Sequence, residues 1–82
     1  MATQEQVALQ NLLRSIRKEA SLSQQGLAQR LGKPQSFVSK YESGERRLDI
    51  LEVLLVCQAV GMPFVLFARR LEEALSGLPG NK

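Results

Sequence analysis

Apolar residues recur every three or four positions over most of the chain, a spacing that predicts helices and not strands. Five helices are expected, over about residues 4–20, 23–32, 35–43, 49–60 and 64–76. The residues expected to face the core are Leu9, Leu12, Leu13 and Ile16 in the first helix, Ile50, Val53, Leu54 and Cys57 in the fourth, and Phe64, Phe67, Ala68, Leu71 and Leu75 in the fifth. The pattern therefore predicts an all-α fold.

Residues that start and stop helices divide positions 22–47 into two short helices with a sharp turn between them. Ser23 can cap the first helix by accepting a backbone hydrogen bond, and Gly32 is suited to end it. Pro34 fits the first turn of the next helix, and Gly44 marks its end. The two helices and the short turn have the dimensions of a helix-turn-helix unit.

The second of these helices has two chemically different faces. At 100° per residue, Phe37, Val38 and Tyr41 fall on one side, and a polar strip falls on the other: Gln35, Ser36, Ser39, Lys40 and Ser43. Such side chains can hydrogen-bond base edges and phosphates. Any surface helix has a polar face, but this strip contains no acidic residue and is followed directly by Arg46 and Arg47. The combination favours a DNA-reading helix.

The segments LSQQGLAQRLG and VSKYESG resemble the lambda-repressor-like, Cro/cI-type helix-turn-helix of the XRE family of transcriptional regulators, over about Leu9 to Phe67. The resemblance implies a five-helix, lambda-repressor-like DNA-binding domain. It implies that Gln24 contacts a phosphate and supports the recognition helix, and that Ser43, Arg46 and Arg47 grip the DNA backbone. The implied base-contacting residues are Gln35, Ser36, Ser39 and Lys40.

The same resemblance pairs Arg17 with Glu42 as a buried ion pair between helices, although two unrelated surface charges would give the same sequence. Three residues depart from the family pattern: Gly26, Pro34 and Phe37. Phe37 is bulkier than the usual residue, which leaves two roles open. It could pack inward or touch a thymine methyl group.

Length and charge agree with a small nucleic-acid-binding domain. The chain has 82 residues, enough for one domain, expected over residues 1–76 with a flexible tail over 77–82. Residues 14–47 contain eight Lys and Arg against three Glu, whereas the rest contains three basic and five acidic residues. The positive charge is therefore concentrated on the helix-turn-helix segment.

Several classes of function are disfavoured by what the chain lacks. It has no histidine and one cysteine, Cys57, so neither a disulfide within the chain nor an ordinary zinc site is expected, and no cofactor is predicted. The remaining polar residues have no spacing that suggests acid–base catalysis, so an enzyme is not expected. The apolar region 51–68 is interrupted by Glu52, Gln58 and Gly61-Met62-Pro63, which argues against a membrane span. The N-terminus lacks the pattern of a signal peptide, and a cytoplasmic protein is expected.

Four apolar residues are predicted to point away from the core: Leu51, Leu55, Val65 and Leu66. They suggest a homodimer interface, unless the packing of the five helices covers them. The sequence therefore predicts a DNA-binding transcriptional regulator of a bacterium or phage, acting as a repressor that binds double-stranded DNA at a palindromic operator as a homodimer. The alternative is an antitoxin or anti-activator whose main partner is another protein.

Overall fold

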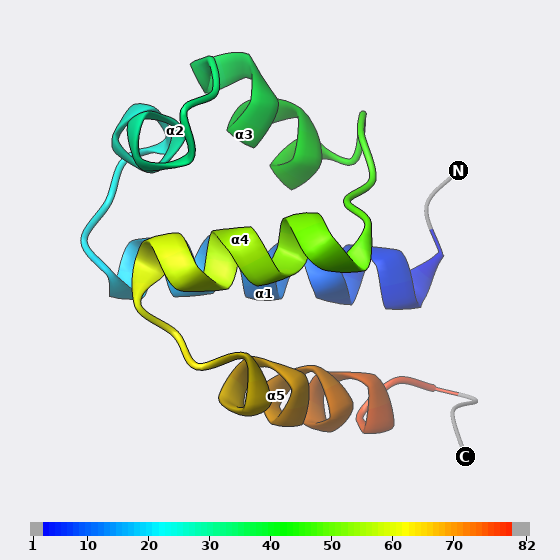
Figure 1. Ribbon diagram of the computed structural model, residues 1–82. Coiled ribbons are helices and arrows are strands. Elements are labelled where there is room, and N and C mark those ends of the chain that lie inside the picture. The colour runs from blue at the N-terminus through cyan, green and yellow to red at the C-terminus, as the bar shows by residue number, and fades with distance from the viewer. Residues whose placement is uncertain (1–2, 80–82) are drawn as a thin grey trace.

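The computed structural model describes residues 3–79 and contains five α-helices, as predicted (Figure 1). Their bounds are α1, Gln4–Glu19; α2, Gln24–Leu31; α3, Gln35–Ser43; α4, Ile50–Val60; and α5, Phe64–Ser76. Each bound lies within one residue of the sequence-based expectation. The described part of the chain has no β-strand.

Ser23 and Gly44, which were expected to begin and end helices, do so. The Ser23 hydroxyl accepts from the Gly26 N–H at 2.9 Å, which caps α2. Asp49 and Glu52 form a reciprocal capping box at the start of α4, with N···O distances of 2.8 and 2.9 Å. Gly44 ends α3 with a φ of +91°, and a Cβ there would lie 2.8 Å from the amide nitrogen of Gln10. Any other residue at position 44 would be strained.

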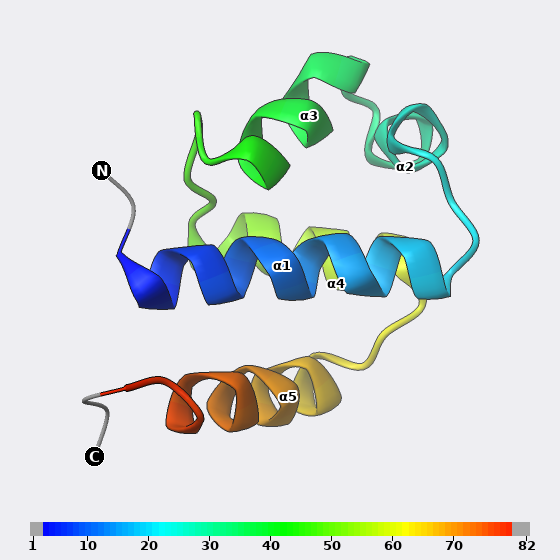
Figure 2. The same ribbon diagram turned by 180° about the vertical axis from the view of Figure 1, so that it is seen from behind.

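The helices lie in three levels, which Figures 1 and 2 show from opposite sides. The middle level consists of α1 and α4 side by side. The pair α2 and α3 covers one side of this level, and α5 covers the other (Figures 1 and 2). The recognition-helix candidate α3 is thus held far from α5.

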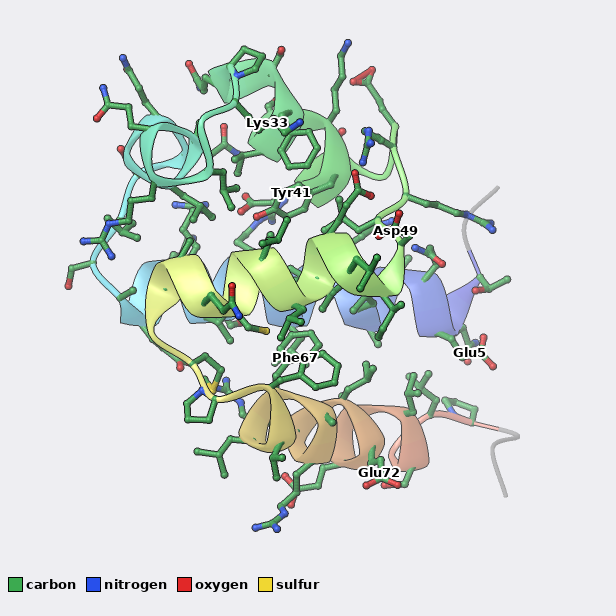
Figure 3. The ribbon with its side chains drawn as sticks, in the orientation of Figure 1. Glu5, Lys33, Tyr41, Asp49, Phe67 and Glu72 are labelled. Carbon is green, nitrogen blue, oxygen red and sulfur yellow. The ribbon has the colours of Figure 1, made fainter. Side chains whose placement is uncertain are left out.

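The core lies where these levels meet, and eleven hydrophobic residues there are each no more than 8% exposed. Phe67 points from α5 into the middle level, and Tyr41 points from α3 toward α4 (Figure 3). The other members are Leu12, Leu13, Ile16, Leu27, Ala28, Val38, Val53, Val56 and Cys57. The predicted faces of α1 and α5 agree with this core, since Leu9, Phe64 and Leu71 pack against it while partly buried.

The prediction that Ile50 of α4 is buried in the core was wrong. Ile50 is 65% exposed, Leu54 is only half-buried, and Val56, which we did not assign to the core, is fully buried. Ile50 is the first residue of α4 and lines an open groove toward α5, beside Leu48 and Phe64. Helical spacing gave the direction of its side chain correctly but not the extent to which the neighbouring helices cover it.

Within residues 3–79 no single helix is long and apolar enough to cross a bilayer, and α4 with α5 would reach that length only as a pair bent by 113°.

The hydroxyl group of Tyr41 leads to a prediction about stability. Tyr41 is 1% exposed, and its hydroxyl oxygen has no hydrogen-bond partner among the described residues. Burial also raises the pKa of this hydroxyl well above its usual value. A buried polar group without a partner destabilises the folded state by ~1–3 kcal/mol.

Tyr41→Phe keeps the ring and removes the unpaired hydroxyl, so we expect the free energy of unfolding to stay equal or to rise by about 1 kcal/mol. Urea denaturation followed by circular dichroism measures this change. Tyr41→Leu is the control, because it removes ring contacts and should destabilise the protein. A clear loss of stability in Tyr41→Phe would show that the hydroxyl is satisfied in solution.

Candidate nucleic-acid interface

The helix-turn-helix is formed by α2 and α3, joined by a tight turn. Gly32 adopts a φ of +67°, and the N–H of Lys33 donates to the carbonyl of Ala28 at 3.0 Å, which closes the end of α2. Leu27 and Ala28 of α2 and Val38 of α3 are fully buried between the two helices and the middle level. Burial of these residues fixes α3 relative to the rest of the domain.

The outward face of α3 carries the predicted polar strip. Gln35, Ser36 and Lys40 are exposed, and Ser39 is half-buried. Val38, Tyr41 and Glu42 face inward. No acidic residue lies on the strip. The exposed face of α3 therefore offers amide, hydroxyl and ammonium groups, the donors and acceptors that match base edges.

Gln24 connects this strip to the interior. Its side-chain nitrogen donates to Oε1 of Glu42 at 3.0 Å, and its side-chain oxygen accepts from the side-chain nitrogen of Gln35 at 3.3 Å. Gln24 is half-buried at the start of α2, where the resemblance predicts a supporting residue. The side chain of Gln35 is thus oriented by a contact from the neighbouring helix.

The carboxylate of Glu42 lies at the centre of a buried polar network. Arg17 donates from Nε and Nη2 to its two oxygens at 2.7 and 3.0 Å, and Nη1 of Arg17 donates to the carbonyl of Leu22 at 2.9 Å. Arg17 is 8% exposed and Glu42 is 2% exposed, so the two residues form a buried bidentate pair and are not separate surface charges. The network ties α3 to α1 and to the loop before α2.

The ionisation of this pair follows from the same contacts. Burial alone would raise the pKa of Glu42, but hydrogen bonds from Arg17 and Gln24 and the charges of Arg17 and Arg14 outweigh it and lower the pKa below its ordinary value. The hydrogen bond to Glu42 raises the pKa of Arg17. Both residues are charged near neutral pH.

Ser43, Arg46 and Arg47, expected at the DNA backbone, lie at and beyond the end of α3. The hydroxyl of Ser43 donates to the Lys40 carbonyl at 3.1 Å. Arg46 pairs with Glu52 at 2.8 Å and covers the ring of Phe37, whereas the side chain of Arg47 is exposed. The two arginines therefore have different surroundings.

Phe37 packs toward α4 and does not project from the reading face. Its ring meets that of Tyr41 edge-to-face at 5.6 Å between centroids. The ammonium of Lys33 lies 5.5 Å from the centroid of the Phe37 ring. Of the two roles left open for Phe37, the structure shows the packed one.

Comparison with known proteins agrees with this geometry. A family model described as helix-turn-helix matches residues 13–67. The fold is similar to that of an XRE-family like protein from Pseudomonas syringae pv. tomato str. DC3000, with a TM-score of 0.79, 43% sequence identity and coverage of 84% of each chain. The chain belongs to the XRE family of helix-turn-helix proteins. No curated protein matched the sequence.

Membership of the XRE family supports a DNA-binding regulator as the general function. The family fold is regulatory and is not usually catalytic. In the described part of this XRE-family chain no group of three His, Cys, Asp or Glu residues could hold a metal ion. Cys57 is buried, and burial raises the pKa of its thiol to about 11, so the reactive thiolate is disfavoured.

The four residues assigned to a dimer interface are all exposed in this XRE-family domain. Leu51 and Val65 are each 67% exposed, so the packing of the five helices does not cover them. Leu55 lines a shallow depression with Leu31 and Phe37, whereas Leu66 lines another beside the end of α1. The exposed apolar residues thus extend over two sides of the domain, and Ile50 adds to those on α4.

Three contacts of the XRE-family domain were not found from sequence. Arg14 joins the Glu42 network, with its Nε 3.6 Å from Oε1, and helical spacing places it one turn before Arg17. The pair of Arg46 and Glu52 joins a loop to a helix, where no periodicity applies. Arg70 and Glu19 link α5 to α1 at 2.7 Å although they are 51 positions apart. Only the first of these had a signal in the sequence.

Proposed function

We propose that the protein is a sequence-specific transcriptional repressor that binds a palindromic operator as a homodimer and acts by occluding a promoter. The single observation that carries this proposal is the acid-free polar face of α3. Gln35, Ser36 and Lys40 are exposed there, and Gln24 orients the side chain of Gln35. A helix that presents such groups outward on a fixed scaffold suits the major groove.

The proposed contacts divide into two kinds. Gln35, Ser36, Ser39 and Lys40 contact base edges, with Gln35 suited to adenine and Lys40 to guanine. Gln24, Ser43 and at least one of the arginines at 46 and 47 contact the phosphate backbone. Glu42 does not repel the DNA because Arg17 and Arg14 neutralise it.

The proposal of a homodimer rests on the small number of base pairs that one short helix can contact. Two copies related by a two-fold axis would place two recognition helices about 34 Å apart and would read an inverted repeat. The exposed apolar residues of α4 and α5, Leu51, Leu55, Val65 and Leu66, support the proposal of a contact between copies.

A second candidate is an antitoxin or anti-activator that binds another protein through these residues. This function is favoured by Ile50 and Leu51 on α4, because about two-thirds of each residue is exposed. The oligomeric state discriminates the two functions. A pure partner-binding protein would be monomeric alone and would not select a DNA sequence.

Selection of bound duplexes from a random pool tests DNA binding, symmetry and base preference together. We expect an enriched inverted repeat with half-sites one helical turn apart. Enrichment of a single half-site would contradict the homodimer. A pool that remains random after several rounds would contradict sequence-specific binding.

Gln35→Ala and Lys40→Ala should each weaken binding to the selected duplex by about 1–3 kcal/mol and relax the preference at one or two base pairs per half-site. Each substitution removes a side chain on the reading face and leaves the core of α3 intact. Fluorescence anisotropy with a panel of single-substitution duplexes measures both effects.

Asn11→Ala and Lys18→Ala are the controls for these variants, because both residues are exposed on α1, outside the helix-turn-helix and outside the helices assigned to the dimer contact. If Gln35→Ala and Lys40→Ala both kept the affinity and the base ranking of the parent protein, α3 would not be the reading element.

A further inference from the structure

The side chain of Arg46 is turned back onto the protein from the loop between α3 and α4. Nη1 and Nη2 donate to the two carboxylate oxygens of Glu52 at 3.2 and 2.8 Å. Nη1 also donates to the carbonyl oxygen of Arg47 at 3.1 Å. The guanidinium carbon lies 4.8 Å from the centroid of the Phe37 ring, within the range of a cation–π contact. Arg46 therefore bridges the flank of α3 and the first turn of α4.

The partners of Arg46 are themselves fixed. Oε1 of Glu52 accepts from the N–H of Asp49, at the N-terminus of α4 in Figure 3, so the same carboxylate caps α4 and holds Arg46. Phe37 packs against the buried ring of Tyr41. The backbone N–H of Arg46 donates to the Lys40 carbonyl at 3.2 Å, which closes the end of α3. These contacts place Arg46 between α3 and α4.

Arg47 is placed differently. Its side chain is exposed, and no hydrogen bond or ion pair of that side chain is present within residues 3–79. To reach a phosphate, Arg46 would have to leave two charge-assisted hydrogen bonds and an aromatic ring, whereas Arg47 would leave nothing comparable. An arginine already paired with a carboxylate also gains less from a phosphate, because its charge is largely balanced.

We propose that the two arginines have separate tasks. Arg46 is a positioning residue that sets the orientation of α3 through Phe37 and Glu52, and Arg47 is the arginine that contacts the phosphate backbone. This inference rests on the proposed DNA-binding function, and it changes the sequence-based prediction, which assigned both arginines to the backbone.

The salt dependence of binding separates the two tasks. Affinities for the selected duplex and for a random duplex are measured at several KCl concentrations for the full chain. Arg47→Ala should weaken both duplexes alike and reduce the slope of log K against log salt by ~0.9 for each lost contact. Arg46→Ala should leave the slope near that of the parent and weaken the selected duplex about five- to tenfold more than the random one, because misorientation of α3 affects base contacts.

Lys18→Ala is the control, since it removes one positive charge from an exposed position of α1, outside the helix-turn-helix and outside the helices assigned to the dimer contact. Its effect on the slope gives the contribution of net charge alone. This contribution is subtracted from the changes in slope measured for Arg46→Ala and Arg47→Ala.

For Glu52→Gln, the effect of net charge and the positioning role of Arg46 predict opposite changes in DNA affinity. Loss of an acidic residue near the interface would strengthen binding to every duplex if only net charge mattered. The positioning role predicts the reverse for the selected duplex, because Arg46 loses its charged partner. Arg46→Lys should not restore selectivity, since an ammonium cannot make the bidentate contact.

An NMR measurement on the free protein tests the contact without DNA. The Nε–H proton of Arg46 should be shifted upfield by the ring of Phe37, and Phe37→Leu should abolish the shift. Circular dichroism and thermal melts confirm that each variant is folded.

The possible results distinguish this inference from the function on which it rests. Selective binding by the parent, with an Arg46→Ala slope lowered as much as that of Arg47→Ala, would overturn the division of tasks and leave the proposed function intact. A parent protein that binds selected and random duplexes equally would overturn both. An Arg46 resonance that is unchanged in Phe37→Leu would overturn the ring contact through which Arg46 is proposed to act.

Discussion

Glu42→Gln or Arg17→Met should lower the free energy of unfolding by about 3–5 kcal/mol, enough to unfold much of a small domain at room temperature. Each change leaves the opposite charge buried without its partner. The pair is bidentate, at 2.7 and 3.0 Å, and neither residue is more than 8% exposed. Urea denaturation at pH 7 measures the loss.

The exposed pair of Arg70 and Glu19 is a matched control. It has the same bidentate geometry, with both hydrogen bonds at 2.7 Å, but lies on the surface between α1 and α5. Arg70→Gln should therefore have a much smaller effect than Arg17→Met. The double change Arg17→Met with Glu42→Leu should recover much of the lost stability, because no charge is left buried. Equal, small losses at both pairs would contradict the burial of Arg17 and Glu42.

The dependence of stability on pH provides a second measurement of the same pair. The contacts with Arg17, Gln24 and Arg14 lower the pKa of Glu42 in the folded state. A lowered folded-state pKa contributes stability above the ordinary glutamate pKa of about 4.3, and that contribution is lost as the pH falls through the folded-state value. The parent protein should lose stability over this acidic range, and Glu42→Gln should lose less.

Leu51→Glu and Val65→Glu should each give a folded monomer whose affinity for the selected duplex is lower by about 10²–10⁴-fold. Both residues are 67% exposed within one chain, so a charge at either position disturbs no core contact. In a two-fold dimer the new glutamate would lie close to the same glutamate of the second copy, and the contact would lose apolar area. The loss in affinity is large because two linked half-site contacts become two independent ones.

Sedimentation equilibrium and binding assays measure the two effects. Asn11→Glu adds the same charge on the exposed side of α1 and should leave the dimer intact. A parent protein that is monomeric at tens of micromolar, together with unchanged DNA binding by Leu51→Glu, would exclude the homodimer. The exposed residues would then favour a contact with a different protein.

The helix bounds could be predicted from sequence because the signals at helix ends are local. Ser23, Asp49 and Glu52 act through backbone groups within three residues, and Gly44 acts through its own φ angle. Such interactions do not depend on how the helices pack. The polar face of α3 was predictable for a similar reason, since the direction of a side chain follows from helical geometry.

The depth of burial could not be predicted in the same way. Ile50 lines the groove toward α5, as its spacing indicates, but its side chain remains 65% exposed. The different surroundings of Arg46 and Arg47 could not be predicted either, because adjacent residues in a loop have no periodicity that separates them. Glu52, six positions later, decides which arginine is held. The pairing of Arg17 with Glu42 was accessible only through the resemblance to a family.

The division of α3 into an anchored side and an open side affects how the protein can evolve. Val38, Tyr41 and Glu42 are fixed by packing and by the Arg17 contact, so few substitutions are tolerated there. Gln35, Ser36 and Lys40 are exposed and support little else in the domain, so replacing them should change the free energy of unfolding by less than ~0.5 kcal/mol. The proposed function therefore allows new operator preferences to arise by single substitutions on one surface, and gene duplicates to diverge in their targets without compensating mutations in the core.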